Sequence, residues 1–421
     1  MKPLDQIHFM QLDTETHFDP YPFFRLLRET RPVYKEPDYG VYLVTRIPDI
    51  MEVNRNSASF SNVVAPTGPF GPLPPSLDEL EEWRESMVGP DRLLTNDPPD
   101  HTRYRSLLNR LFTPRRVALI EPRIRHHVTG LIDSFINDSQ AEFVLQFAHQ
   151  LPIAVIGELL GVPAEDIEHF KRLLHEQFLK MSESFVANPQ ASSRPSRKSP
   201  GNEYQATLTE YFTRYVRDRR ANPRSDATSE LATAVAEDGT LFPIETIISM
   251  CQLLFAAGGD ANTPELLVNG MRLLATQPQL AATLRENLDL VPRFIEELLR
   301  YDTTAMGLFR IAREDTEVGG VKIPKGSIVM VLYASANHDE ERFENGHEFD
   351  LDRDPKSHFS FGYGAHHCPG APIARLEAKV AFGELLSRLH NIRLAEGAQL
   401  EPLPSVILRS WRTLPVAFDP A

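Results

Sequence analysis

One short segment near the carboxyl end of the sequence combines the residue types that a thiolate ligand beside a flat molecule needs. The segment FGYGAHHCPG spans residues 361–370 and contains Cys368. Pro369 suits the first turn of a helix, where a backbone N–H is expendable, so Cys368 is expected at a helix N-terminus. The helix dipole and the free N–H groups there favour thiolate over thiol. The glycines let the backbone approach a flat ligand, and Phe361 can shield the sulfur from water.

The second cysteine carries no comparable signal. Cys251 lies in an apolar run, residues 247–257, where a cysteine behaves as a small buried hydrophobe. Two cysteines cannot build a disulfide scaffold for 421 residues, and no CxxC pair indicates zinc. For Cys368 the alternative is a buried cysteine in an accidental glycine-rich loop.

Two pairs of polar residues are spaced to share a helix face. His101 and Arg105 are four residues apart, and two cationic donors on one face suit a carboxylate or a phosphate. Glu297 and Arg300 are three residues apart and can form an ion pair. Taken alone, each pair also fits a solvated helix surface.

A long apolar helix, expected over residues 244–274, is interrupted in its middle by the segment AGGDANTP, residues 257–264. The two glycines weaken the helix, and Pro264 lacks the N–H that would bond the carbonyl of Asp260. A freed carbonyl beside an acid can hold O2 and water, as helix distortions at functional sites do. The alternative is a simple bend in a core helix.

The elements that must position these residues are mostly helical. The apolar periodicity predicts helices over residues 102–111, 115–135, 147–160, 207–219, 244–274, 278–300 and 371–389. Short strands are expected over residues 41–44 and 318–331, and loops over residues 64–75 and 187–202. No internal repeat is found, which disfavours solenoids and propellers. The pattern predicts a mainly α fold with small β-sheets (α+β).

Composition excludes several classes of function. Apolar residues make up 42% and charged residues 24% of the chain, as in ordinary globular proteins. The net charge of -14 argues against nucleic-acid or anionic-membrane binding. No apolar run reaches the ~18 residues that span a bilayer, and the N-terminus lacks a signal-peptide pattern. A cytoplasmic protein without a membrane anchor is expected.

The cysteine segment resembles the haem-binding signature F-x-x-G-x-H-x-C-x-G of the cytochrome P-450 superfamily, and further matches make a soluble bacterial type the best fit. The resemblance implies haem b (iron protoporphyrin IX) with Cys368 as its axial ligand, and propionate binding by His101, Arg105 and Arg310. It also implies a structural network of Glu297 and Arg300 with Arg353, and one triangular domain over residues 1–421. The five fixed positions of the signature are Phe361, Gly364, His366, Cys368 and Gly370, and His366 is the family's further propionate-binding position.

The central helix departs from the family pattern A-G-x-(D/E)-T. Asp260 matches the acid that brings in protons, whereas Ala261 stands where a threonine hydroxyl is expected. Asn262 and Thr263 follow, but on a regular helix they point ~100° and ~200° away unless a bulge brings one back. We expect proton delivery through Asp260 with ordered water, Asn262 or a substrate hydroxyl.

The family's activity is oxygen insertion: one atom of O2 enters a C–H bond, a hydroxylation. The resemblance implies a mainly apolar small-molecule substrate. The sequence has no dinucleotide-type glycine loop and no iron–sulfur cysteine cluster, so electrons are expected from a separate ferredoxin and ferredoxin reductase. The expected pocket residues are Phe70, Leu73, Leu254, Ala257, Ala261, Thr304, Met306, Leu308, Val406 and Ile407.

Two other functions fit the same signature. Ala261 raises the possibility of peroxide-driven or other oxidative chemistry on the same fold, although residues 257–264 lack the arginine that peroxide-using members often carry. A non-enzymatic haem sensor is the second alternative, and it would not need the interrupted helix with its acid.

Overall fold

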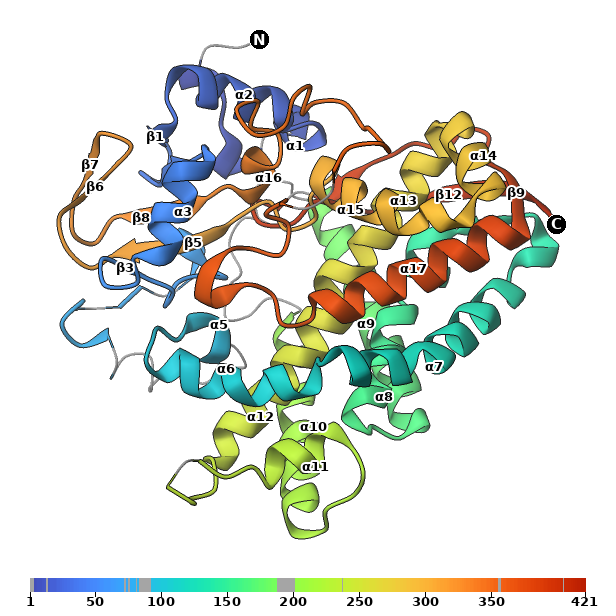
Figure 1. Cartoon of the computed structure of the whole chain (residues 1–421), viewed down its shortest axis with the longest axis horizontal. Coiled ribbons are helices and arrows are strands. Elements are labelled where there is room, and N and C mark those ends of the chain that lie inside the picture. Colours follow the sequence, from blue (N-terminus) through green and yellow to red (C-terminus); the bar gives the residue numbers. More distant parts are fainter. Residues whose placement is uncertain are drawn as a thin grey trace.

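Helices fill most of the molecule, and a small sheet occupies one corner of a roughly triangular outline (Figure 1). The structure is a computed structural model that describes residues 4–12, 14–71, 73–74, 76–80, 82, 92–187, 201–236, 238–354, 357–403 and 405–421. The mainly α fold with small sheets is confirmed. No helix among these residues is long and apolar enough to cross a bilayer.

The α-helices are α1 (Thr14–Phe18), α2 (Tyr21–Thr30), α3 (Ile47–Arg55), α5 (Arg92–Thr95), α6 (Asp100–Leu111), α7 (Pro114–Asp133), α8 (Leu151–Leu160), α9 (Ala164–Ala187), α10 (Gly201–Ala221), α11 (Ala227–Ala232), α12 (Ile244–Ala256), α13 (Asn262–Thr276), α14 (Pro278–Glu286), α15 (Val291–Tyr301), α16 (Tyr333–Ala336) and α17 (Ala371–Arg388). The strands are β1 (Val33–Lys35), β2 (Tyr42–Val44), β3 (Phe60–Ser61), β4 (Gln140–Glu142), β5 (Leu308–Ala312), β6 (Thr316–Val318), β7 (Val321–Ile323), β8 (Ile328–Val331), β9 (Leu389–Leu394), β10 (Pro402–Leu403), β11 (Ser410–Trp411) and β12 (Pro415–Pro420).

The largest sheet has the strand order β1-β2-β8-β5-β3, and only the β2–β8 pair in it is parallel. In this sheet Arg310 pairs with Val329 and Leu308 with Val331. Because alternate residues of a strand face the same side, Leu308 and Arg310 share one face and Phe309 takes the other. Strand β5 therefore offers one apolar and one cationic side chain to the same side of the sheet.

Three predicted elements are divided in the structure. The helix expected over 278–300 breaks into α14 and α15, because Asn287 Oδ1 accepts a bond from the Asp289 N–H and ends the first helix. The strand expected over 318–331 is three strands, since Gly319 and Gly320 turn at φ 55° and 78°. The helix expected from 147 is a π-helical turn, Val144–Ala148, followed by α8.

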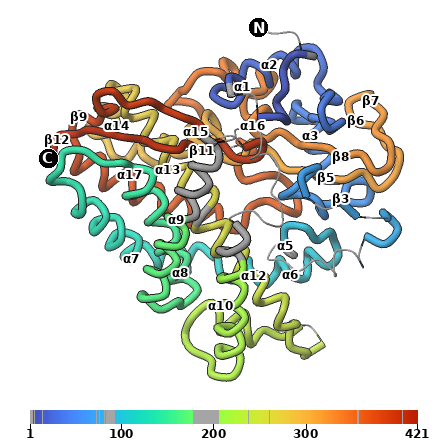
Figure 2. The backbone as a smooth tube through the Cα atoms, turned by 180° about the vertical axis from the view of Figure 1, so that it is seen from behind, coloured from blue at the N-terminus to red at the C-terminus, as the bar shows by residue number. Residues whose placement is uncertain are grey.

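The long central helix crosses the whole molecule behind α17 (Figures 1 and 2). It consists of α12, a π-helical segment at Ala257–Ala261, and α13. Pro264 and the two glycines thus produce a helix distortion, as expected, and the distortion is a π-bulge rather than a break. Helices α7 and α17 run side by side in both views, so α17 is held against the helical layer.

A buried ion network ties α15 to the chain that leads into the cysteine segment. Glu297 and Arg300 are each 2% exposed, and Arg300 Nη2 and Nε lie 2.7 and 2.8 Å from the Glu297 carboxylate. Arg300 Nη1 also donates to the carbonyls of Asn337 and Gly346. Arg353 Nε donates to Glu297 at 3.2 Å. The three residues expected to form this network lie together.

Replacing Arg300 with leucine is expected to lower the free energy of unfolding by ~3–5 kcal/mol, because the buried Glu297 carboxylate would lose the two bonds from Arg300 and keep only Arg353 as a charge partner. Urea titration measures this loss. The matched control is Arg293→Leu, which removes an exposed partner of Asp352 3.6 Å away and is expected to cost at most ~1 kcal/mol. Equal losses in the two variants would contradict the role of the buried pair.

Candidate functional site

A cavity of about 430 Å³ opens between the central helix, the start of β5 and the cysteine segment, residues 361–370. Most of its lining is aliphatic or aromatic. The apolar residues around it are Leu93, Leu94, Leu108, Phe112, Ile156, Leu253, Leu254, Ala256, Ala257, Leu266, Leu299, Ala305, Leu308, Ile373, Ala374, Ile407 and Leu408. Such a surface favours an apolar ligand with few polar anchors.

Cys368 lines this cavity together with Phe361, Pro369 and Gly370. Its backbone N–H donates to the Phe361 carbonyl at 2.8 Å, which closes the segment into a tight loop. Burial raises the pKa of the Cys368 thiol above its ordinary value, and the Gly370 N–H and the Arg105 guanidinium oppose this rise only in part. The helix N-terminus alone therefore does not outweigh burial in this pKa; bonding to a metal cation would deprotonate the sulfur.

Two histidines that line the cavity lie close together, with their ring planes tilted by 31°. The His101 and His366 ring centroids are 3.8 Å apart. Burial lowers the pKa of His101 to about 4 and that of His366 to about 2, so both rings are neutral at pH 7. Both ring nitrogens of His101, and Nε2 of His366, are buried and have no hydrogen-bond partner among the described residues. Buried ring nitrogens without a partner are satisfied when a polar ligand group binds beside them.

Two arginines complete this polar corner. Arg310 is 2% exposed and donates to its neighbouring Phe309 carbonyl at 2.7 Å and to Asn54 Oδ1 at 2.9 Å. Arg105 donates to Asn109 Oδ1 at 3.1 Å and to the His367 carbonyl. Within the described part of the chain neither guanidinium pairs with a carboxylate. Two cations without anions beside two orphan histidines can bind an anionic ligand.

The glycines of the cysteine segment differ in backbone conformation and in what they pack against. Gly362 and Gly364 have φ of 72° and 78°, which side chains rarely adopt. A Cβ at Gly364 would lie 3.4 Å from the Asn54 carbonyl oxygen, so Gly364 packs against α3 and does not line the cavity. Gly370 does line it, and a Cβ there would lie 3.8 Å from Cys368 Sγ.

The π-bulge turns three consecutive residues toward the cavity: Ala261, Asn262 and Thr263 all line it. Asn262 Oδ1 is buried and has no hydrogen-bond partner among the described residues. The backbone of Asp260 belongs to the π-helical segment, but its side chain lies outside the described residues. A regular helix would have spread Asn262 and Thr263 around its axis, so the distortion supplies the polar groups that Ala261 lacks.

The expected pocket residues separate into two groups. Leu254, Ala257, Ala261, Thr304, Leu308 and Ile407 line the cavity. Four others lie elsewhere. Phe70 packs on Tyr39 and Phe309, on the opposite face of β5 from Leu308; Leu73 is 48% exposed; and Met306 and Val406 are buried in an apolar cluster with Phe309. Phe70, Met306 and Val406 thus pack in the neighbouring core, and Leu73 lies at the surface.

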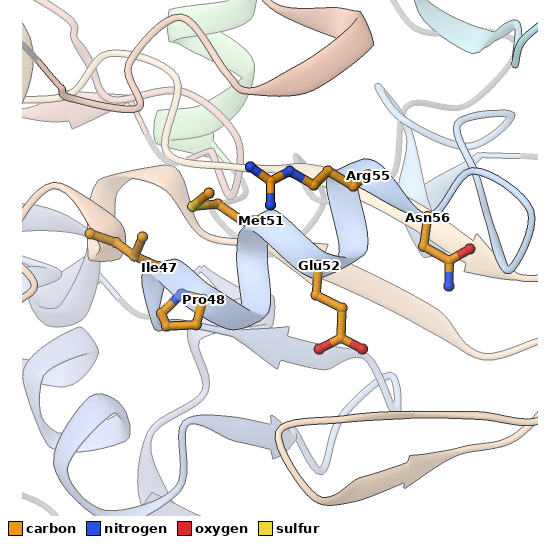
Figure 3. A pocket seen from close by; sticks show the side chains of 6 residues that line it. All are labelled: Ile47, Pro48, Met51, Glu52, Arg55 and Asn56. Carbon is orange, nitrogen blue, oxygen red and sulfur yellow. The ribbon is translucent and has the colours of Figure 1, made fainter.

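Other residues at the site carried no signal in the sequence. Tyr333 and Glu377 line the cavity, and burial raises the pKa of Glu377 well above its usual range. Arg375 lies 4.5 Å over the Phe361 ring and is held by the Glu296 carboxylate. A second hollow, a surface groove along α3, contains none of the expected residues (Figure 3).

The comparisons with known proteins agree on one family. The cytochrome P450 family model matches residues 80–405. The chain is 33% identical over 411 residues to the cytochrome P450 monooxygenase PikC of Streptomyces venezuelae, covering 95% of this chain and 91% of that protein. The structure of Mycobacterium marinum cytochrome P450 CYP150A6 is 35% identical, with a TM-score of 0.88 and 100% of both chains covered.

A structure of CYP109E1 from Bacillus megaterium in complex with corticosterone is 28% identical, with a TM-score of 0.80, covering 96% of this chain and 99% of that one. The fold, the signature around Cys368 and these matches show that the chain belongs to the cytochrome P450 family of monooxygenases, which bind haem through a cysteine thiolate.

Proposed function

We propose that residues 1–421 form one haem domain that inserts one oxygen atom from O2 into a C–H bond of a mainly apolar small molecule. The observation that supports this best is the cavity itself, which joins Cys368, the orphan histidines and an aliphatic wall in one space. Bound haem supplies O2 activation at an iron whose thiolate ligand favours O–O cleavage.

The residues present fit haem at both of its ends. Cys368 is proposed as the axial ligand, with Phe361 covering the sulfur and Gly370 leaving room beside it. His101, Arg105, Arg310 and His366 are proposed to hold the two propionates, because they are donors without carboxylate partners in the described structure. Glu297, Arg300 and Arg353 are proposed to support the chain around the cysteine segment without contacting haem.

The groups around the π-bulge are proposed to move protons. Asn262 Oδ1 is an acceptor that can hold a water or a substrate hydroxyl, and Thr263 adds a hydroxyl at the same wall. Asp260 is proposed as the acid that exchanges protons with solvent. The aliphatic lining excludes bulk water, so protons reach the site only through such held groups.

The substrate proposal is a mainly apolar molecule with a small number of hydrogen-bonding groups. The aliphatic lining and the few polar side chains, such as Thr304 and Asn262, support it. One similar protein binds the steroid corticosterone in its solved complex, which fits this class.

Electrons are proposed to come from a separate ferredoxin with its reductase, which would dock near the exposed Arg110 and Arg115. Arg116 already pairs with Glu230. The cytoplasmic location also remains a prediction.

A peroxide-driven reaction is the second candidate, and Ala261 favours it because the usual hydroxyl is absent. Product formed with O2 and an electron donor, in the presence of catalase, supports the O2-dependent proposal. Product formed only with added peroxide would support the alternative.

Replacing Cys368 with alanine is expected to abolish the strongly red-shifted carbon monoxide band of the reduced protein, because that band reports a thiolate ligand. Cys251→Ala is the matched control: Cys251 is fully buried beside Thr228 and lies away from the cavity. This variant is expected to keep the band. A Cys368→Ala protein that retained it would overturn the ligand assignment.

A screen of ferric protein against a compound library is expected to shift the Soret band to shorter wavelength with apolar compounds that carry one or two hydroxyl or carbonyl groups. Charged, strongly polar compounds of the same size serve as controls and are expected to leave the band unchanged. A shift confined to the polar set would contradict the substrate proposal.

Replacing Asn262 with leucine is expected to lower the coupling of electrons to product by about tenfold or more, because the acceptor that holds a proton-carrying water or hydroxyl is lost. The double variant Ala261→Thr/Asn262→Leu should recover part of the coupling, since the new hydroxyl lies on the same wall. Ala256→Thr/Asn262→Leu, which places the hydroxyl five residues earlier on the cavity wall, should not recover it. Unchanged coupling in Asn262→Leu would show that protons take another route.

A further inference from the structure

Helix α3 lies outside the cavity but contacts the site through two consecutive residues. In Figure 3 Met51 and Arg55 project from one side of α3, whereas Glu52 and Pro48 lie on the other. The Arg55 guanidinium bonds the Tyr363 hydroxyl and lies 5.1 Å from the centre of that ring. This contact fixes the end of α3 against the cysteine segment.

The preceding residue, Asn54, reaches the polar corner of the cavity. Its Oδ1 accepts bonds from Arg310 Nη2 at 2.9 Å and from the Tyr333 hydroxyl at 3.1 Å. Its Nδ2 donates to the Ile50 carbonyl at 2.8 Å. Because a flipped amide would point its N–H groups at the Arg310 donor and away from an acceptor, these contacts admit only one orientation of the side chain.

Asn54 is also the only side-chain partner of Arg310 in the described structure; the other bond of this guanidinium goes to the Phe309 carbonyl. An aspartate here would neutralise the cation before any ligand arrived. A neutral amide restrains the guanidinium and leaves its charge available, although a buried charge without a counter-ion is costly. Tyr333 lines the cavity, so the same oxygen also orients a second group at the site.

We infer that Asn54 is a positioning residue for the cofactor: it holds the Arg310 guanidinium toward the polar end of the cavity while leaving its positive charge unpaired. This inference rests on the proposed role of Arg310 in holding a haem propionate. Asn54 itself is not expected to touch the cofactor, and it acts through Arg310.

The test is the rate at which haem leaves the purified ferric holoprotein, followed by transfer to excess apomyoglobin. Asn54→Leu is expected to release haem about tenfold faster, because the guanidinium loses a bond to a charged group. The control is Asn56→Leu, the same substitution two residues along, where the amide bonds only to Ser59. It is expected to release haem at the wild-type rate.

A double-mutant cycle separates positioning from a general loss of stability. If Asn54 acts through Arg310, Asn54→Leu in an Arg310→Gln background should change the release rate by less than about twofold, since coupled residues are not additive. Full tenfold effects in both backgrounds, or no effect of Asn54→Leu on the wild-type background, would overturn the inference. Asn54→Ala, which adds no atoms, replaces the leucine variant if that chain does not fold.

The carbon monoxide spectrum of the wild-type protein distinguishes this failure from failure of the proposed function. A wild-type protein without the thiolate band would refute the haem site as a whole. A normal wild-type band, together with equal haem release from the wild-type and Asn54→Leu proteins, would refute only the role of Asn54.

Discussion

The carboxylate of Glu297 and the guanidinium of Arg300 are both 2% exposed, and we propose that the rest of the site depends on how these two buried charges are satisfied. Charges leave water only where every donor and acceptor finds a partner. Here the partners are backbone groups of residues 337–350 and the guanidinium of Arg353. The network therefore fixes the path of residues 337–353, and we propose that it supports the position of Cys368 further along the chain.

The polar corner of the cavity follows the opposite rule. Around Glu297 opposite charges are paired, whereas within the described residues Arg105 and Arg310 pair with no carboxylate, and His101 and His366 keep ring nitrogens without a hydrogen-bond partner. Burial keeps the two histidines neutral, which limits the repulsion among four nitrogenous groups in one place. An arrangement that is unfavourable in isolation would become favourable on binding a dianionic ligand, which is the basis of the proposed propionate site.

The parts of this site that short-range spacing specifies could be predicted from the sequence. Cys368 and His366 lie within one loop, and His101 and Arg105 on one helical turn, so periodicity and a motif were sufficient. Side chains whose direction depends on sheet packing could not be predicted in this way. Met306 and Phe70 belong to segments that approach the cavity, but their side chains pack in the core around Phe309. Nor could Asn54, because its partner Arg310 is 256 residues away and an isolated asparagine near a helix end has many ordinary explanations.

Ala261 shows how backbone geometry can compensate for a missing side chain. In a regular helix the loss of one hydroxyl at this position would leave an aliphatic wall, since its neighbours would turn away by about 100° each. The π-bulge widens the turn, and Asn262 and Thr263 both reach the cavity as a result. The same bulge packs closely against α8 at Gly259, because a Cβ there would lie 3.2 Å from the Ile153 backbone. The glycines and Pro264 of this segment permit the distortion. The distortion brings Asn262 and Thr263 to the cavity, and this compensates for the alanine at position 261.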